Sequence, residues 1–279
     1  WGSLALVVRP VALPSAQIVV YRIAFGFAAL LLVALIRRVK PDPQALRRFI
    51  PGLLLSGACM GGNWVALFEA YRFVDVSIAT LAYYCAPIVV MLGAAMFYHE
   101  RLTPFKLACL GGAVLGMLLL GSVTPGGSDP LRGVLCGLIS AVLYAGVTLI
   151  NKSVRGIDDV SCTLIQLLGA GIVVTIYACA TGGGVWQCPT LLQWACLLVL
   201  GIVHTALALC LYFSAVRALS AHRVALCSYL DPVSALLFSA VFLNERMQPV
   251  HLIAAALILG SAALGSLYDA RRTQTKKDR

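Results

Sequence analysis

Long apolar stretches separated by short polar breaks follow one another along nearly the whole chain. A membrane-spanning helix needs about 20 mostly apolar residues, and the breaks carry the Pro and Gly residues that begin or end helices. The pattern predicts an all-α integral membrane protein with ten transmembrane helices, the first of them truncated in this chain. We place the truncated helix at 1–10 and the other spans at 14–36, 49–71, 76–98, 104–122, 131–151, 161–180, 192–213, 220–243 and 250–268.

Composition supports this assignment and excludes a soluble protein. Of 279 residues, 61% are hydrophobic and only 11% are charged, whereas soluble chains carry about 25% charged residues. The cysteines lie singly in apolar segments without metal-ligand spacing, so we expect neither a metal nor a cofactor. No nucleophile motif, phosphate-binding loop or carboxylate pair stands out, and we therefore predict that the protein is not an enzyme.

The basic residues indicate how the chain is oriented. The net charge is +10, and 16 of the 21 Lys and Arg residues fall in loops or termini on one side of the predicted bundle. Short loops rich in Lys and Arg remain in the cytoplasm, which predicts that both termini are cytoplasmic and that 269–279 is a basic cytoplasmic tail. This placement explains the positive charge without a nucleic acid partner.

One phrase occurs twice. FYHERLTP at 97–104 recurs as FLNERMQP at 242–249, and segment 70–104 matches segment 215–249 at eleven of 35 ungapped positions. We infer a duplication into repeats 1–122 and 131–268. Because each repeat holds five helices, the second is inverted relative to the first, which is a recurrent plan of secondary transporters. The alternative is a duplication that only builds a stable bundle.

These features resemble the EamA type of the drug/metabolite transporter superfamily. The resemblance rests on Pro87 and Pro232 in the fourth helix of each repeat, on the Glu-Arg phrase before each fifth helix, and on the opening Trp1-Gly2-Ser3. It implies a permease in the inner (plasma) membrane that moves a small organic solute, most often outward, as a monomer or a homodimer. No ATP-binding motif is present, so a gradient would supply the energy, with proton coupling as one form of it.

Charged residues within the spans are the first site candidates, because a charge inside a bilayer costs about 2.5–3.5 kcal/mol. Arg22 and Asp231 are predicted at similar depth, and Asp231 has only Ala86 as its counterpart in the first repeat. Arg22 suits a carboxylate group of the solute, and Asp231 an amine or a coupling proton. The alternative is that the two charges pair directly and only neutralise each other.

Further candidates are weaker. Glu69 and His204 could take part in proton coupling, but Glu69 could equally form a surface pair with Arg72, and His204 could be a hydrogen-bonded packing residue. Polar and aromatic residues near the middle of the spans could line a cavity for an amphipathic solute: Trp1, Asn63, Trp64, Tyr83, Tyr84, Tyr144, Gln166, Tyr212 and Tyr229. Glycine pairs at GxxxG spacing predict close helix packing: Gly57 with Gly61, Gly112 with Gly116, and Gly133 with Gly137.

The sequence thus predicts an exporter of amino-acid-like or related metabolites that works by alternating access. Two alternatives stay open, a multidrug exporter for lipophilic cations and a membrane sensor or structural protein without transport.

Overall fold

A computed structural model describes residues 2–39, 42–98, 103–122, 128–180, 186–211, 230–243 and 248–277. In these residues the chain is a bundle of helices. Their order is α1 (Leu4–Val8), α2 (Ser15–Ile36), α3 (Pro43–Phe73), α4 (Val76–Tyr83), α5 (Ala86–Tyr98), α6 (Pro104–Ser122), α7 (Pro130–Ser153), α8 (Asp159–Ala180), α9 (Leu191–Gly201), the π-helix η1 (Ile202–Leu207), α12 (Leu230–Phe242) and α13 (Pro249–Lys277).

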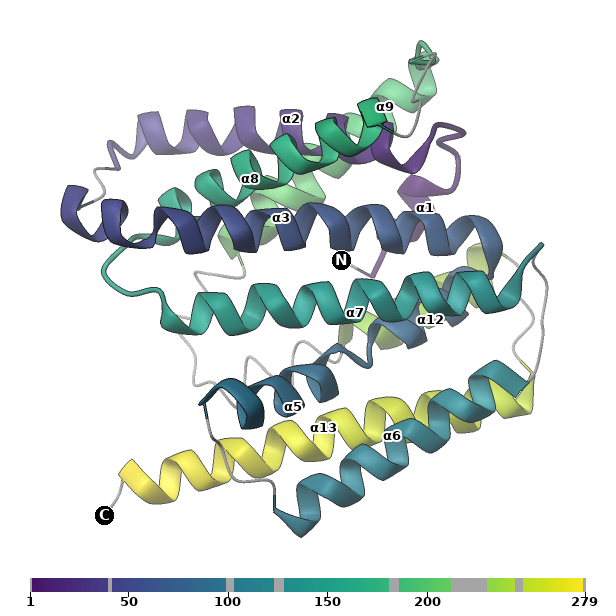
Figure 1. The fold of residues 1–279 in the computed structure, drawn as a ribbon. Helices are drawn as coiled ribbons and strands as arrows, with labels where there is room; N and C mark the ends of the chain where they lie inside the picture. The colour runs from purple at the N-terminus through teal and green to yellow at the C-terminus, as the bar shows by residue number, and fades with distance from the viewer. Residues whose placement is uncertain are drawn as a thin grey trace.

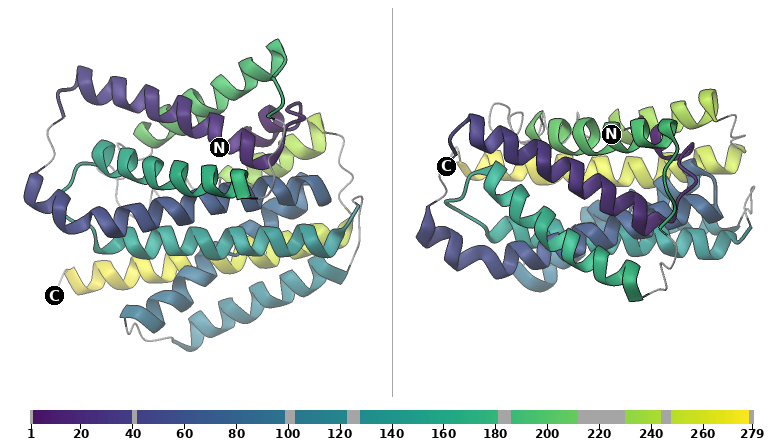
Figure 2. Two further views of the ribbon diagram at one scale, coloured as in Figure 1. Left: turned by 45° about the horizontal axis from the view of Figure 1, so that its top comes forward. Right: turned by 90° about the horizontal axis from the view of Figure 1, so that it is seen from above.

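The long helices α3 and α7 run side by side through the middle of the bundle (Figure 1). Helices α2, α8 and α9 lie on one side of them, and α6 packs along α13 on the other (Figure 2). The short helices α4 and α5 contact α7 and α13. Six helical segments of the described chain are long and apolar enough to cross a membrane.

The predicted spans agree closely with the helices where both are described. Helices α2, α6, α7 and α8 begin and end within two residues of the predicted limits. Helix α3 begins earlier than predicted, at Pro43, because Asp42 caps it by accepting a hydrogen bond from the backbone N–H of Gln44. Helix α13 continues to Lys277, through most of the segment predicted as a tail.

The predicted span 76–98 is not one continuous helix. It divides into α4 and α5 at Tyr84 and Cys85. The cause is Pro87, which has no N–H for the carbonyl of Tyr83 and whose ring crowds that carbonyl. The break leaves irregular backbone inside a predicted span, an arrangement that membrane proteins tolerate only inside the protein or along a cavity.

The predicted glycine contacts are present, and each pair brings two helices together. Gly57 and Gly61 let α3 approach α8 so closely that a Cβ atom at Gly57 would clash with the backbone of Gln166. Gly112 and Gly116 do the same between α6 and α13, and Gly133 and Gly137 lie against Val74 and Ala82 around the start of α7. Small residues thus set the helix spacing, as they do in many membrane bundles.

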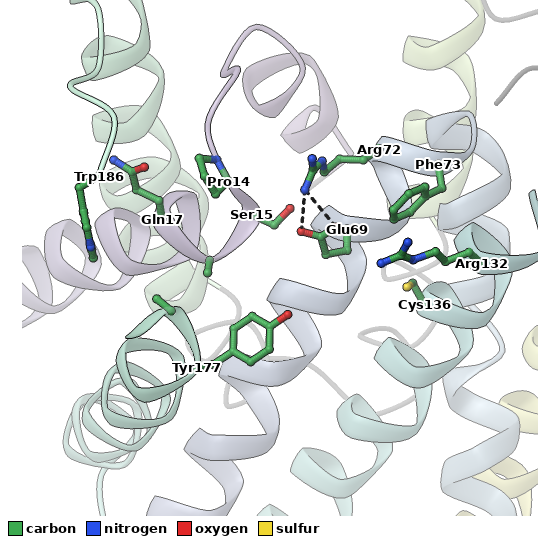
Figure 3. A pocket seen from close by; sticks show the side chains of 12 residues that line it. Pro14, Ser15, Gln17, Glu69, Arg72, Phe73, Arg132, Cys136, Tyr177 and Trp186 are labelled. Carbon is green, nitrogen blue, oxygen red and sulfur yellow. Dashed lines mark hydrogen bonds and ion pairs between the residues drawn. The ribbon is translucent and has the colours of Figure 1, made fainter. Parts of the chain in front are cut away.

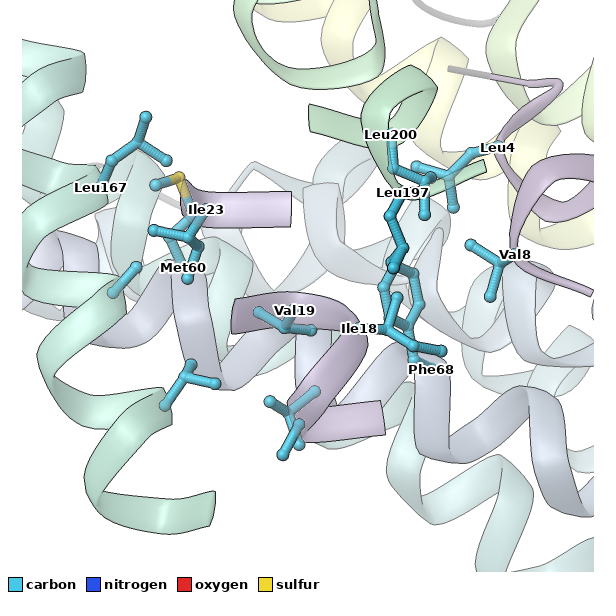
Figure 4. Close-up of a cluster of buried hydrophobic side chains, with 14 of the residues drawn as sticks. Leu4, Val8, Ile18, Val19, Ile23, Met60, Phe68, Leu167, Leu197 and Leu200 are labelled. Carbon is cyan, nitrogen blue, oxygen red and sulfur yellow. The ribbon is translucent and has the colours of Figure 1, made fainter. Parts of the chain in front are cut away.

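The buried apolar side chains form two clusters. The larger joins α1, α2, α3, α8 and α9 and contains the fully buried Phe68, with Ile18, Val19 and Leu197 around it (Figure 4). The smaller joins α3, α4 and α13 and is built largely of alanines. The larger cluster therefore surrounds the part of α2 that carries Arg22.

Candidate functional site

Arg22 is buried in the bundle, with 3% of its surface exposed. It lies seven residues after the start of α2, which is about 10 Å along the helix. Its guanidinium group stacks on the ring of Trp64 from α3, with 4.0 Å from Cζ to the ring centroid, and lies 5.9 Å from the ring of Phe68. Aromatic faces stabilise a cation in this position.

A single hydrogen bond holds the guanidinium group. Nε of Arg22 donates to Oγ1 of Thr205 at 2.9 Å, and Thr205 in turn donates to the carbonyl of Leu200 at 3.0 Å. Within the described residues Arg22 forms no ion pair, and no residue there accepts a hydrogen bond from its Nη groups. The face of the guanidinium group that could bind a carboxylate is therefore not used by the protein in this part of the chain.

Thr205 lies in η1, where the backbone changes from α-helical to π-helical geometry. Gly26 and Gly201 allow the close approach of α2 at this point, because a Cβ atom on either would meet the opposite helix within 3.0 Å. Single π-helical turns occur often at functional sites. Here the turn presents the Thr205 hydroxyl group to Arg22.

A group of tyrosines and one acid lies at the break between α4 and α5. Tyr84 donates a hydrogen bond of 2.7 Å to Oδ2 of Asp231 in α12. The ring of Tyr83 packs edge-on against those of Tyr84, at 5.3 Å, and Tyr144, at 5.6 Å. Tyr83 lies within electrostatic range of both Arg22 and Asp231. Tyr84 therefore holds one of the two charges that the sequence singled out.

The direct ion pair between Arg22 and Asp231, one of the alternatives from the sequence, is not formed. The guanidinium group bonds Thr205, whereas the carboxylate accepts from Tyr84. Similar depth along two helices is therefore not enough to bring two charges into contact.

His204 precedes Thr205 in η1 and is buried. Its Nε2 lies 3.1 Å from Oγ of Ser3, and its Nδ1 lies 3.5 Å from the carbonyl oxygen of Val199. Both ring nitrogens thus have protein neighbours, as expected for the hydrogen-bonded packing residue that was the plainer alternative for His204. The side chain still lies within electrostatic range of Arg22 and Asp231.

Two predicted cavity residues instead join helices. Asn63 donates to the carbonyl and the hydroxyl oxygen of Ser140 in α7, at 2.7 and 2.8 Å. Gln166 donates to Oδ1 of Asn151, at 2.6 Å, and to Oγ of Ser56, at 3.0 Å. Ser56 lies eight residues before Trp64, about 12 Å along α3, so Gln166 belongs to a different level of the bundle from Arg22.

Glu69 forms the surface pair with Arg72, at 3.1 Å and one turn apart near the end of α3. Tyr229, Tyr212 and Trp1 lie outside the described residues, as do the Glu-Arg phrases at 100–101 and 245–246. Sequence reasoning did not single out Thr205 or Phe68. Thr205 could have been found, because it and His204 are adjacent polar residues in an otherwise apolar run; a phenylalanine in such a run gives no comparable signal.

The bundle and its buried charges define a multi-pass membrane protein with a polar centre. The model of the EamA-like transporter family matches residues 1–122 and again residues 131–267. The chain therefore belongs to the EamA-like transporter family.

Relatives agree with this class. The chain is 27% identical over 179 residues to the uncharacterized transporter YxxF of Bacillus subtilis, covering 62% of this chain and 56% of that protein. It is 28% identical over 192 residues to the pseudopaline exporter CntI of Pseudomonas aeruginosa, covering 68% and 65%. The alignments thus span less than two thirds of these two relatives.

Two further matches cover nearly the whole chain. An uncharacterized transporter of Archaeoglobus fulgidus is 24% identical over 263 residues, which is 94% of this chain and 91% of that protein. One solved crystal structure superposes with a TM-score of 0.66 at 23% identity, covering 98% of this chain and 94% of the other. That structure supports the fold alone.

Proposed function

We propose that the protein exports small metabolites that carry a carboxylate group, amino-acid-like zwitterions foremost, by alternating access around Arg22 and Asp231. The observation that carries this proposal is the buried guanidinium group of Arg22. Its aromatic and hydroxyl supports hold it in place while no acidic residue of the described chain neutralises it. A buried charge of this kind is costly unless something pairs with it, and a carboxylate on the solute fits a planar guanidinium group.

Asp231 supplies the complementary charge. Its carboxylate lies at the start of α12, bonded to Tyr84 at the break of the opposite repeat. A solute with an ammonium group near its carboxylate would satisfy Arg22 and Asp231 together, and the intervening tyrosines would contact its apolar part. A coupling proton on Asp231 is the second role consistent with this position.

Reciprocal helix contacts support two inverted repeats as the moving parts. Helix α3 of the first repeat packs on α8, the second helix of the other repeat, and α9 packs on α2 in return. Likewise α4 packs on α7, and α12 on α1; α2 meets α8, and α6 meets α13. A two-fold relation between the halves would produce such reciprocal contacts, and Pro104 and Pro249, 145 residues apart, each begin a helix. Inverted halves can exchange inward-open and outward-open shapes.

Outward transport across an inner (plasma) membrane, with both termini in the cytoplasm, completes the proposal. The excess of Lys and Arg on one side supports the orientation. The similarity to a protein named as an exporter supports the direction.

Flux into liposomes tests the proposal. Purified protein would be reconstituted, preloaded with unlabelled solutes, and assayed for counterflow of labelled amino acids, of their uncharged amides and of a lipophilic cation. We expect saturable counterflow of at least one carboxylate-bearing solute and little of its amide. Transport of the lipophilic cation alone would establish the multidrug alternative, and no counterflow of any solute would favour a protein without transport.

Asp231→Asn separates the two roles of the acid. If Asp231 exchanges a proton in each cycle, the variant loses the acceleration by an imposed pH gradient but retains counterflow. If Asp231 binds the amine of the solute, counterflow of zwitterions falls and that of simple carboxylates persists. Tyr84→Phe is the matched control, because it removes the hydroxyl group that bonds Asp231 and keeps the carboxylate.

A further inference from the structure

A hollow that Arg22 does not line lies at one end of the bundle. It has a volume of about 460 Å³, within the range of small-molecule sites. Its walls come from the start of α2, the ends of α3 and α8, the start of α7 and the segment before α9 (Figure 3). We call it the end pocket, and none of the residues that form the proposed central site lines it.

The polar side of the end pocket carries two guanidinium groups and one carboxylate. Arg72 is paired with Glu69 at 3.1 Å. The guanidinium group of Arg132 lies 4.4 Å over the ring of Phe73 instead. The neighbouring Asp129 is not among the lining residues, and its carboxylate accepts from the backbone N–H of Arg132 as the cap of α7. The lining residues therefore carry an excess positive charge.

The opposite side of the pocket is aromatic and held in place. Trp186 and Tyr177 line it, and Figure 3 places both across from the arginines. Gln17 in α2, which is 4% exposed, forms two hydrogen bonds with Gln187, the residue after Trp186. Nε2 of Gln17 donates to the carbonyl oxygen of Gln187 at 2.7 Å, and the backbone N–H of Gln187 donates to Oε1 of Gln17 at 3.3 Å. The segment that carries Trp186 is thus fixed to α2.

The end pocket and the surroundings of Arg22 use neighbouring residues of α3. Glu69 and Arg72 at the pocket follow directly on Phe68, which is 2% exposed and lies 5.9 Å from the guanidinium group of Arg22. Phe68 itself belongs to the larger buried cluster (Figure 4).

We propose that the end pocket is a second binding site, a vestibule for aromatic or amphipathic organic anions. Arg132 receives the anionic group, with Arg72 beside it, and the ring stacks against Trp186. The role of this site along a transport path rests on the proposed function. Binding of an anion in the end pocket does not require transport.

Tryptophan fluorescence can report on the two sites separately. The chain has four tryptophans, of which Trp64 lies in the central site and Trp186 lines the end pocket. One variant would keep Trp186 and carry phenylalanine at the other three positions; a second would keep only Trp64. The probes are para-nitrobenzoate, whose nitro group quenches indole fluorescence, and para-nitrobenzamide, which has the same ring without the charge. Both would be titrated into purified protein in detergent.

We expect the benzoate to quench Trp186 saturably. The benzamide should bind more weakly by a factor of about ten or more, and a factor of ten corresponds to about 1.4 kcal/mol. Arg132→Gln should remove this difference, and Arg132→Lys, which retains the charge, should keep part of it. Arg22→Gln should leave the Trp186 signal intact while it removes the Trp64 signal.

Equal quenching by both probes, or a Trp186 signal that Arg132→Gln does not change, would overturn the vestibule. Loss of the Trp186 signal in Arg22→Gln would assign the binding to the central site, and this result would also overturn the proposal of a vestibule. Failure of the proposed function looks different, since the Trp64 signal would then be absent while the Trp186 signal persisted. Comparable melting temperatures of the variants ensure that a lost signal is not lost folding.

Discussion

Two helix junctions, that of α3 with α8 and that of α2 with α9, are built differently. At the first, α3 meets α8 through Gly57, and neutral amide and hydroxyl groups of Ser56, Asn151 and Gln166 bond one another. At the second, α2 meets α9 and η1 through Gly26 and Gly201, and a charged group is held by one hydroxyl group on a π-helical turn. Both junctions use glycine to bring backbones together.

The difference separates a structural contact from a site. At the α3–α8 junction the polar groups satisfy each other, so the contact is complete without a ligand. At the α2–α9 junction the guanidinium group of Arg22 has Thr205 as its one hydrogen-bond partner within the described residues. We propose that this junction binds the solute, because no acidic residue of the described chain forms an ion pair with its guanidinium group.

Arg22→Gln should have the largest effect on transport. The change removes two charge-assisted hydrogen bonds to a carboxylate, about 3 kcal/mol together, and so lowers flux of carboxylate-bearing solutes about a hundredfold. Liposome counterflow measures it. Arg48→Gln, which removes an exposed guanidinium group from α3, is the control and should transport normally. Unchanged flux in Arg22→Gln would make the α2–α9 junction as structural as its counterpart.

Gly57→Ala should be the most damaging single change at the α3–α8 junction. The new Cβ atom would clash with the backbone of Gln166, and such overpacking costs about 1–3 kcal/mol. Thermal unfolding of the solubilised protein would show a lower transition temperature. Gly111→Ala, where the new methyl group meets nothing within 4 Å, should be neutral or slightly stabilising; equal effects of the two changes would contradict the close packing.

Thr205→Val should affect function more than stability. It keeps the shape of the side chain but removes the acceptor that positions Nε of Arg22, a loss of about 1 kcal/mol and hence about fivefold in flux. We expect the main change in the apparent affinity for the solute. Thr205→Ser retains the hydroxyl group and should restore most of the flux; if it does not, Thr205 acts through packing against Gly26 instead.

Gln166→Met should have the smallest effect of these changes, and it should affect stability more than function. It removes the two hydrogen bonds that Gln166 donates between helices, and such bonds in membrane proteins contribute about 0.6 kcal/mol each on average. The transition temperature should fall slightly, and counterflow at saturating solute should stay unchanged. A selective loss of solute affinity would return Gln166 to the cavity wall that the sequence predicted.

Sequence reasoning was strongest for helices and weakest for contacts between them. The positions of α2, α6, α7 and α8 were predictable because each is a long apolar run with marked ends, and a bilayer demands such runs. The same reasoning joined α4 and α5 into one span, since hydropathy does not register a break that preserves the apolar pattern. Pro87 was noted, but its effect on the backbone depends on what surrounds it.

For the site, scarcity was the useful signal. Arg22 and Asp231 stand out because charges are rare within spans, and Tyr84 because it precedes a repeated proline. Asn63 and Gln166 carry the same kind of polar signal, yet they join helices. Whether a polar residue faces a neighbouring helix or a solute depends on its rotation about the helix axis, and nearly uniform apolarity leaves that rotation unmarked.

The sequence by itself determined the membrane class, the family, the limits of α2, α6, α7 and α8, and the residues whose burial needs a reason, because hydrophobic length and rare charges are properties of the chain. Only the tertiary structure decided the partners: Thr205 and Trp64 for Arg22, Tyr84 for Asp231, and the pairing of Arg72 that leaves Arg132 to the end pocket. These contacts join residues far apart in sequence. Their geometry follows from where glycines let helices approach and where Pro87 interrupts one, which no local pattern specifies.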